Sequence, residues 1–96
     1  DVVNYYVKKN LKNNSYFSQT KKHLILNDEF FKQPHEIVFR SLSDSLNFIS
    51  KNYYSVRGKK IDKIIKDIQK TSFSRSTLGN CLIEKVNQTI IITKEH

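Results

Sequence analysis

The alternation of apolar and polar positions is clearest between residues 57 and 70, where it has the period of a helix. At about 100° per residue, a set of isoleucines falls within an arc of roughly 100°. This set is Ile61, Ile64, Ile65 and Ile68. Lysines fall on an arc of about 60° almost opposite, at Lys59, Lys63, Lys66 and Lys70. The isoleucines must face a core, so the lysines must face water or a polyanion. We therefore expect a basic amphipathic helix over 56–70.

A longer apolar stripe follows Pro34, whose missing N–H suits the first turn of a helix. Glu36 complements the positive end of the helix dipole there. The stripe consists of Val38, Phe39, Leu42, Leu46, Ile49 and Tyr53, with Ile37 and Phe48 on the other side. A helix with apolar residues on two faces is usually touched by neighbours on both. The pattern predicts the core helix of the fold over 34–53.

The N-terminal residues also show helical spacing, and they predict the end of a preceding or linking helix over 1–13. Its apolar positions are Val3, Tyr6, Val7 and Leu11, with Lys8, Lys9 and Lys12 largely off that face. Residues 15–27 are irregular or briefly extended, with Leu24 and Leu26 alternating with Ile25. Asn27 or Asp28 can cap a short turn before Pro34.

The C-terminal residues change to a strand pattern. Two strand-like runs, 77–85 and 89–94, are joined by a short turn, which predicts a β-hairpin over 77–94. Gly79 interrupts the first run and indicates a bulge or a close backbone approach. The predicted fold is a small α+β domain, mainly helical, with about three helices and this C-terminal hairpin. Its 96 residues are enough for one domain with one modest core. Because the first residue is Asp rather than Met, we expect residues 1–96 to be a fragment of a longer protein.

The net charge of the chain indicates which kinds of molecule it could bind. The chain has 17 basic and 9 acidic residues, for a net charge of +8. Such an excess favours a nucleic acid or an anionic membrane surface. The chain is also rich in Asn and Ile, so a bias toward AT-rich codons is an alternative cause. No apolar run approaches the roughly 20 residues that span a bilayer, and we expect no membrane partner. A single cysteine, Cys81, rules out an internal disulfide and suits a cytoplasmic location.

Residues typical of catalysis or cofactor binding are sparse. The two glycines, Gly58 and Gly79, cannot form a phosphate-cradling loop. The histidines, His23, His35 and His96, have no ligand-like spacing with Cys81. Cys81 itself reads as a buried structural thiol rather than a nucleophile. Asp62 and Asp67 are most simply surface charges of their helix, and Asp44 is a surface residue or a local hydrogen-bonding group. We predict no catalytic residue, no metal and no cofactor for this chain.

The lysine face of the 56–70 helix is the remaining candidate site. Lysines act as point charges, so they would track a phosphate backbone without reading bases. The candidate nucleic-acid contacts are Arg57, Lys59, Lys63, Lys66, Lys70 and Arg75. Tyr53, Tyr54 and Phe73 flank the helix and can stack on a base or simply pack in the core. The alternative for the lysines is a solvated helix face without a ligand.

Three segments together resemble the region that follows the catalytic domain in bacterial tRNA(Ile)-lysidine synthetases. The resemblance covers about residues 23–95, and Thr-Leu-Gly-x-Cys at 77–81 is its most specific part. Positions that match are Leu26, Asp28, Pro34, Glu36, Arg40, Leu42, Arg57, Thr77, Leu78, Gly79 and Cys81. The chain departs from the family pattern at Gln33, where leucine is common, and at Asn80, where a second glycine is usual.

The resemblance implies a parent ligase that uses ATP and Mg to attach lysine to the wobble cytidine of tRNA(Ile), forming lysidine. The family's ATP-binding Ser-Gly-Gly-x-Asp-Ser loop belongs to its N-terminal domain and does not occur in this sequence. The fragment is then an accessory domain, inactive alone, that positions tRNA(Ile) for its own N-terminal catalytic domain. The resemblance also allows the parent enzyme to be a homodimer, of which this chain would be part.

Two other classes of function fit the element order. A winged-helix DNA-binding module would use the 57–70 helix as reader and the hairpin as wing. That helix shows mainly lysine and aspartate outward, whereas base-reading helices usually show Arg, Asn, Gln or Ser. A non-binding domain that braces the catalytic domain or a dimer partner would leave the lysines as solvated charges.

Overall fold

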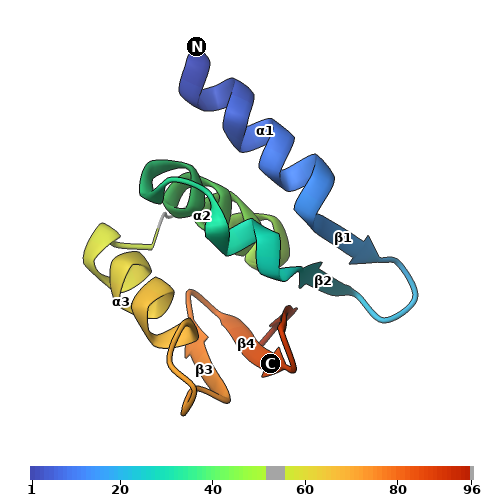
Figure 1. Cartoon of the computed structure of the whole chain (residues 1–96). Coiled ribbons are helices and arrows are strands. Elements are labelled where there is room, and N and C mark those ends of the chain that lie inside the picture. The colour runs from blue at the N-terminus through green and yellow to red at the C-terminus, as the bar shows by residue number, and fades with distance from the viewer. Residues whose placement is uncertain (52–55, 96) are drawn as a thin grey trace.

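A computed structural model describes residues 1–51 and 56–95 of the chain. Its helices are α1 (Val2–Asn14), α2 (His35–Ser50) and α3 (Gly58–Ile68), with a short 3-10 helix, η1 (Asp28–Lys32). Its strands are β1 (Ser15–Ser18), β2 (His23–Leu26), β3 (Arg75–Leu78), β4 (Cys81–Val86) and β5 (Thr89–Lys94). The α2 helix lies between α1 and α3 (Figure 1). The predicted α+β class, with three helices and a C-terminal hairpin, is confirmed.

The strands form one antiparallel sheet in the order β1-β2-β5-β4-β3. The two strands of the C-terminal hairpin, β4 and β5, therefore lie inside the sheet and not at its edges. This is because β2 pairs with β5 and β3 pairs with β4. Residues 15–26, expected to be irregular or briefly extended, instead form a second hairpin, β1–β2. The predicted alternation there is confirmed, since Leu24 and Leu26 are buried while Ile25 is not.

The prediction of one strand across residues 77–85 is wrong. Gly79 and Asn80 form a tight turn between β3 and β4, both with positive φ, at 57° and 62°. Two successive residues with positive φ are typical of a two-residue hairpin turn. Gly79 also lies where the chain approaches closely, because a Cβ there would be 2.5 Å from Val56 Cγ2. The glycine is thus required both by the turn and by its neighbour.

The central helix α2 is covered on two sides, as its sequence predicts, but only one of the two sides is mainly apolar. Val38, Leu42 and Leu46 belong to the main core cluster. On the side toward α1, small residues allow close approach, and Ser41 is fully buried. Phe48 does not lie in the core, however, and its side chain is 55% exposed.

The bounds of α2 are narrower than the predicted 34–53. Pro34 precedes the helix, and its carbonyl accepts hydrogen bonds from the N–H groups of Ile37 and Val38. Lys51 ends the helix in the left-handed conformation. Tyr53 of the predicted stripe and the proposed stacking residue Tyr54 lie outside the described residues, as does His96.

The first helix, α1, is held both by apolar packing of Val7 and Leu11 and by the polar contacts of Asn10. Val7 and Asn10 are its buried residues, and Tyr6, predicted to face the core, is instead 47% exposed. Asn10 Nδ2 donates to the carbonyl of Phe30, at 3.3 Å, and to Ser41 Oγ, at 3.1 Å. These bonds tie α1 to η1 and to α2 at once. In the part of the chain that the structure describes, no helix has the length and apolarity needed to cross a membrane.

Candidate nucleic-acid interface

The helix α3 is anchored by the face that its isoleucines form. All four isoleucines of the predicted arc are buried and belong to the main core cluster. The opposite face carries Lys59, Lys63 and Lys66, which are exposed. Lys70, beyond the end of the helix, is also exposed. Burial of one face therefore fixes the direction in which the other face presents its charge.

The lysine face is partly neutralised by one carboxylate. Asp67 lies one turn after Lys63, and Lys63 Nζ is 2.9 Å from Asp67 Oδ2. Lys70 Nζ is 3.3 Å from Asp67 Oδ1. Hydrogen bonds from Lys63 and then from Lys70 lower the pKa of Asp67 below its ordinary value. Lys59 and Lys66 form no ion pair with any residue in 1–51 or 56–95.

A shallow hollow of about 260 Å³ separates α3 from the edge strand β3. Lys60, Lys63 and Asp67 line it from the helix, and Ser76 and Thr77 line it from the strand. Ammonium groups beside hydroxyl groups are suited to phosphate oxygens, because both can donate hydrogen bonds. The sequence prediction missed Lys60, Ser76 and Thr77. Lys60 falls off the narrow lysine arc, and the hydroxyl-rich composition of residues 71–77 was the only signal for the other two.

Neither of the two predicted arginine contacts lies on the lysine face. Arg57 is the residue before the first helical residue, and it lies about 160° around the helix axis from Lys59. Arg75 is opposite Glu84 in the β3–β4 ladder, whereas its neighbour Ser76 is opposite the buried Ile83. Arg75 therefore points to the sheet face away from the helices. The structure brings the four lysines together and places both arginines away from the face that they form.

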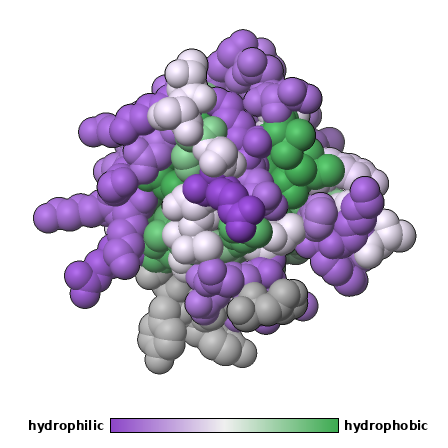
Figure 2. Space-filling view, turned by 90° about the horizontal axis from the view of Figure 1, so that it is seen from below, coloured by the Kyte–Doolittle hydropathy of each residue, from purple (hydrophilic) through white to green (hydrophobic). Residues whose placement is uncertain are grey.

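The space-filling view shows how hydrophilic side chains are distributed over one face of the molecule (Figure 2). Long hydrophilic side chains project from the side of the molecule on which α3 lies in Figure 1 (Figure 2). Apolar surface appears in this view as separate patches between hydrophilic groups. The projecting chains are free to meet a ligand without a rearrangement of the backbone.

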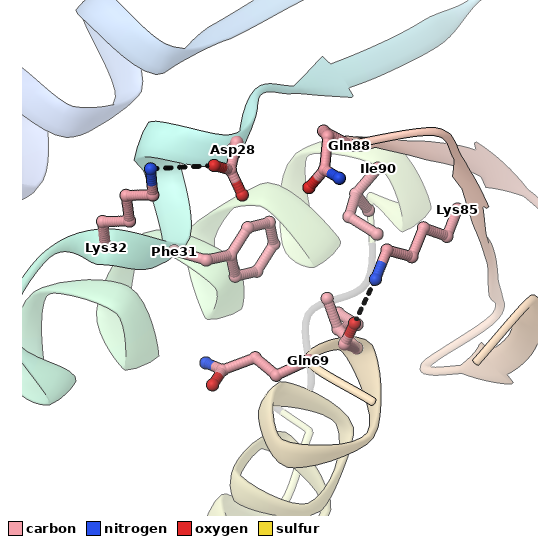
Figure 3. Close-up of a pocket in the computed structure, with 8 residues that line it drawn as sticks. Asp28, Phe31, Lys32, Gln69, Lys85, Gln88 and Ile90 are labelled. Carbon is pink, nitrogen blue, oxygen red and sulfur yellow. Dashed lines mark hydrogen bonds and ion pairs between the residues drawn. The ribbon is translucent and has the colours of Figure 1, made fainter. Parts of the chain in front are cut away.

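A second hollow, of about 250 Å³, lies where α3 ends (Figure 3). Lys85 points into it from β4, and its Nζ donates to the carbonyl of Ile68 at 3.0 Å. On the other side, Lys32 Nζ is 3.0 Å from Asp28 Oδ2. Lys85 thus satisfies a carbonyl at the negative end of the helix dipole, a position that favours cations. Its role is structural, so we exclude it from the candidate interface.

Groups with catalytic potential occupy structural positions. Cys81 is fully buried, as predicted for a structural thiol, and its Sγ is 3.5 Å from the carbonyl of Leu46. Burial is the largest cause that raises the pKa of the Cys81 thiol to about 11. His35 Nε2 is 3.0 Å from Asp62 Oδ1, a contact that joins α2 to α3. No group of three or more His, Cys, Asp or Glu side chains suited to a metal ion occurs among residues 1–51 and 56–95.

Phe73, a proposed stacking residue, is partly buried and packs against the main core cluster. This position fits the alternative of core packing. The candidate interface therefore consists of lysines and hydroxyl groups on α3 and β3, without an aromatic platform among the described residues of that surface.

Comparison with known proteins gives the chain a context. Over 68 residues, 70% of this chain, it is 37% identical to tRNA(Ile)-lysidine synthase of Wolbachia sp. subsp. Brugia malayi (strain TRS). The resemblance to tRNA(Ile)-lysidine synthases is confirmed. The matched stretch spans 16% of that protein's length. No family model and no solved structure matches the chain.

Proposed function

We propose that this chain is the accessory tRNA-binding domain of a cytoplasmic, ATP-dependent tRNA(Ile)-lysidine synthetase. Its role would be to position tRNA(Ile) while a separate catalytic domain converts the wobble cytidine to lysidine. The observation that carries the proposal is the 37% identity to tRNA(Ile)-lysidine synthase over 70% of the chain. This chain would contribute no catalytic group, and ATP and Mg would bind elsewhere in the parent.

The lysine face of α3, with the hollow between α3 and β3, is the surface that we assign to the phosphate backbone. Lys59 and Lys66 have no competing ion pair within the described residues, and Lys63 lines the hollow beside Ser76 and Thr77. A rigid helix that presents several charges in one row can follow successive phosphates. Such contacts position a nucleic acid and carry no sequence information. Choice of tRNA(Ile) would then rest with the rest of the parent.

The sheet topology bears on the winged-helix alternative. A wing is a hairpin that projects beside the recognition helix, whereas β4 and β5 are both interior strands here. Their edges are occupied by β2 and β3. The hairpin is therefore embedded in a five-stranded sheet and is not a separate projection beside α3. This arrangement favours RNA positioning by α3 over duplex DNA reading by a helix and wing.

The experiment is a binding titration of the chain with tRNA(Ile), with an unrelated tRNA and with duplex DNA, each across a salt series. The wild type is compared with a variant in which Lys59, Lys63, Lys66 and Lys70 are changed to Glu. We expect tRNA binding that weakens steeply with salt, that the variant loses, and that exceeds DNA binding. Duplex DNA binding as tight as tRNA binding would favour the winged-helix alternative. Absence of binding at low salt would favour a domain that only braces the parent.

A further inference from the structure

Away from α3, three lysines from separate parts of the chain converge on a cleft of about 390 Å³. Lys22 comes from the β1–β2 turn, Lys51 from the end of α2 and Lys94 from the end of β5. Lys94 pairs with the buried Cys81 in the β4–β5 ladder, so it points to the helix-covered side of the sheet. No acidic residue is among the described residues that line the cleft. The cleft thus concentrates positive charge in a concave site.

An exposed aromatic ring forms part of the same cleft. Phe48 is 55% exposed, and it meets Phe17 edge to face with ring centroids 5.1 Å apart. The contact with Phe17 fixes the orientation of the Phe48 ring while leaving much of its surface uncovered. Gln19 also lines the cleft and offers an amide that both donates and accepts hydrogen bonds. An apolar ring, an amide and three ammonium groups together are suited to the base and phosphates of one nucleotide.

Two of these lysines stand at backbone positions that lysine does not favour. Lys22 and Lys51 have φ of 58° and 55°, in the left-handed region. The other described residues with positive φ are Gly79, Asn80 and Asn87, the types that tolerate this conformation best. Asn at either position would serve the turn or the helix end better than Lys. The presence of Lys at both positions is explained if the ammonium groups bind a ligand.

We propose that this cleft binds an unpaired nucleotide of a single-stranded RNA segment, with the base stacked on Phe48 and the phosphates contacted by Lys22, Lys51 and Lys94. The surface is separate from the lysine face of α3 and does not depend on it. An acidic peptide would satisfy the lysines but would leave the aromatic ring and the amide without a role. The nucleotide is therefore the ligand that uses every group in the cleft.

The chain contains no tryptophan, so a single Trp reports on one site. The test places Trp at Phe48 and measures its fluorescence during titration with an oligouridylate of about eight nucleotides at low salt. Tyr16→Trp is the matched control, because Tyr16 is 66% exposed but does not line the cleft. We expect quenching of the Phe48→Trp signal and none for Tyr16→Trp. Equal quenching of the two, or none of either, would overturn the proposal.

A double change, Lys22→Asn and Lys51→Asn, separates binding from folding. Asn suits the left-handed backbone, so the variant should keep or raise the thermal unfolding midpoint. The same variant should bind the oligouridylate several-fold more weakly, with a salt slope lower by about 1 to 2. Unchanged affinity would contradict the proposal even though the protein is folded.

Phe48→Ser removes the platform and should weaken oligouridylate binding roughly 5- to 150-fold, the range expected for one lost base stack. A poly-glutamate peptide of equal charge is the competing ligand. If it binds the wild type as tightly as the oligouridylate does, the assignment to a nucleotide is wrong. Quenching of Phe48→Trp must also persist when the four α3 lysines are changed to Glu, because its loss would place the oligonucleotide on α3 instead.

Discussion

The helices α1 and α3 both present lysines to solvent, but different forces hold them to the rest of the molecule. Four isoleucines anchor α3 in the core. The buried residues of α1 are Val7 and Asn10, and the amide of Asn10 bonds to η1 and α2. The lysines differ as well, since Asp67 pairs with two on α3, whereas those on α1 form no ion pair within residues 1–51 and 56–95. Exposed lysines alone therefore do not identify a binding surface, and α1 is the natural control for α3.

The largest effect on folding should come from the anchor of α3. Ile61 is fully buried, and Ile61→Ala removes three carbons from the core and leaves a cavity. We expect a loss of about 2–5 kcal/mol in the free energy of unfolding, measured by urea denaturation. Lys60→Ala, at the exposed neighbouring position, should cost less than about 0.5 kcal/mol. Similar losses for both changes would mean that the isoleucine face does not anchor the helix.

The reactivity of the Cys81 thiol measures how well the core is closed between the sheet and the helices. Because its pKa is raised from 9.0 to about 11 in the folded protein, its thiolate fraction at pH 8 should be about 100-fold below that of the unfolded chain. A thiol reagent should therefore label it at least that much more slowly than it labels the chain in urea. The raised pKa stabilises the fold fully below pH 9, and this contribution is lost as the pH rises from about 9 to 11. Fast labelling at pH 8 would contradict its burial.

The buried contacts of Asn10, which anchor α1, should contribute less to the free energy of unfolding than the isoleucines that anchor α3. Asn10→Ala leaves the carbonyl of Phe30 without the amide that bonds to it, and the buried group cannot reach water easily. We expect a loss of about 1–3 kcal/mol in the free energy of unfolding. Asn13→Ala, at an exposed position of the same helix, is the matched control. A loss larger than that of Ile61→Ala would reverse the proposed ranking of the two anchors.

The smallest expected effect concerns the carboxylate that neutralises part of α3. Asp67→Asn releases Lys63 and Lys70 from their ion pairs and raises the net charge by one. Its lowered pKa keeps Asp67 ionised in mildly acidic buffer, so the mutation tests the charge better than a change of pH does. We expect tRNA to bind a few-fold more tightly at low salt. Asp44→Asn makes the same change of charge on α2 and should leave the affinity nearly unchanged.

The sequence pattern predicted the parts of the fold in which burial follows a regular period. The isoleucine arc of α3 and the stripe of α2 are clear examples, because one side of each helix faces the core. The cap of η1 was also predictable, since Asn27 Oδ1 accepts from the N–H of Phe30. In each case residues close in sequence decide the outcome.

Features set by distant contacts could not be predicted. The Gly79–Asn80 turn is an exception, because Gly-Asn is itself a local signal for a two-residue hairpin turn and was instead interpreted as an interruption within one strand. Tyr6 and Phe48 have apolar spacing, but no residue within 1–51 and 56–95 covers them fully. The cleft of Lys22, Lys51 and Lys94 forms only when the β1–β2 turn, the end of α2 and the end of β5 meet. No spacing rule joins three such positions.

The central claim, that the lysines of α3 contact phosphates, is tested most directly by neutralising them and, in a second variant, neutralising three lysines of α1 with one in the β1–β2 turn. One variant changes Lys59, Lys63, Lys66 and Lys70 to Gln. The other changes the same number of exposed lysines elsewhere, namely Lys8, Lys9, Lys12 and Lys21. Both variants lose the same net charge, and tRNA binding is measured from about 50 to 300 mM salt.

We expect the α3 variant to reduce the slope of log affinity against log salt concentration by about 3, and the control variant to change it by less than about 1. Equal reductions in the two variants would show that tRNA responds to the net charge of the chain and not to α3. That result would contradict the account.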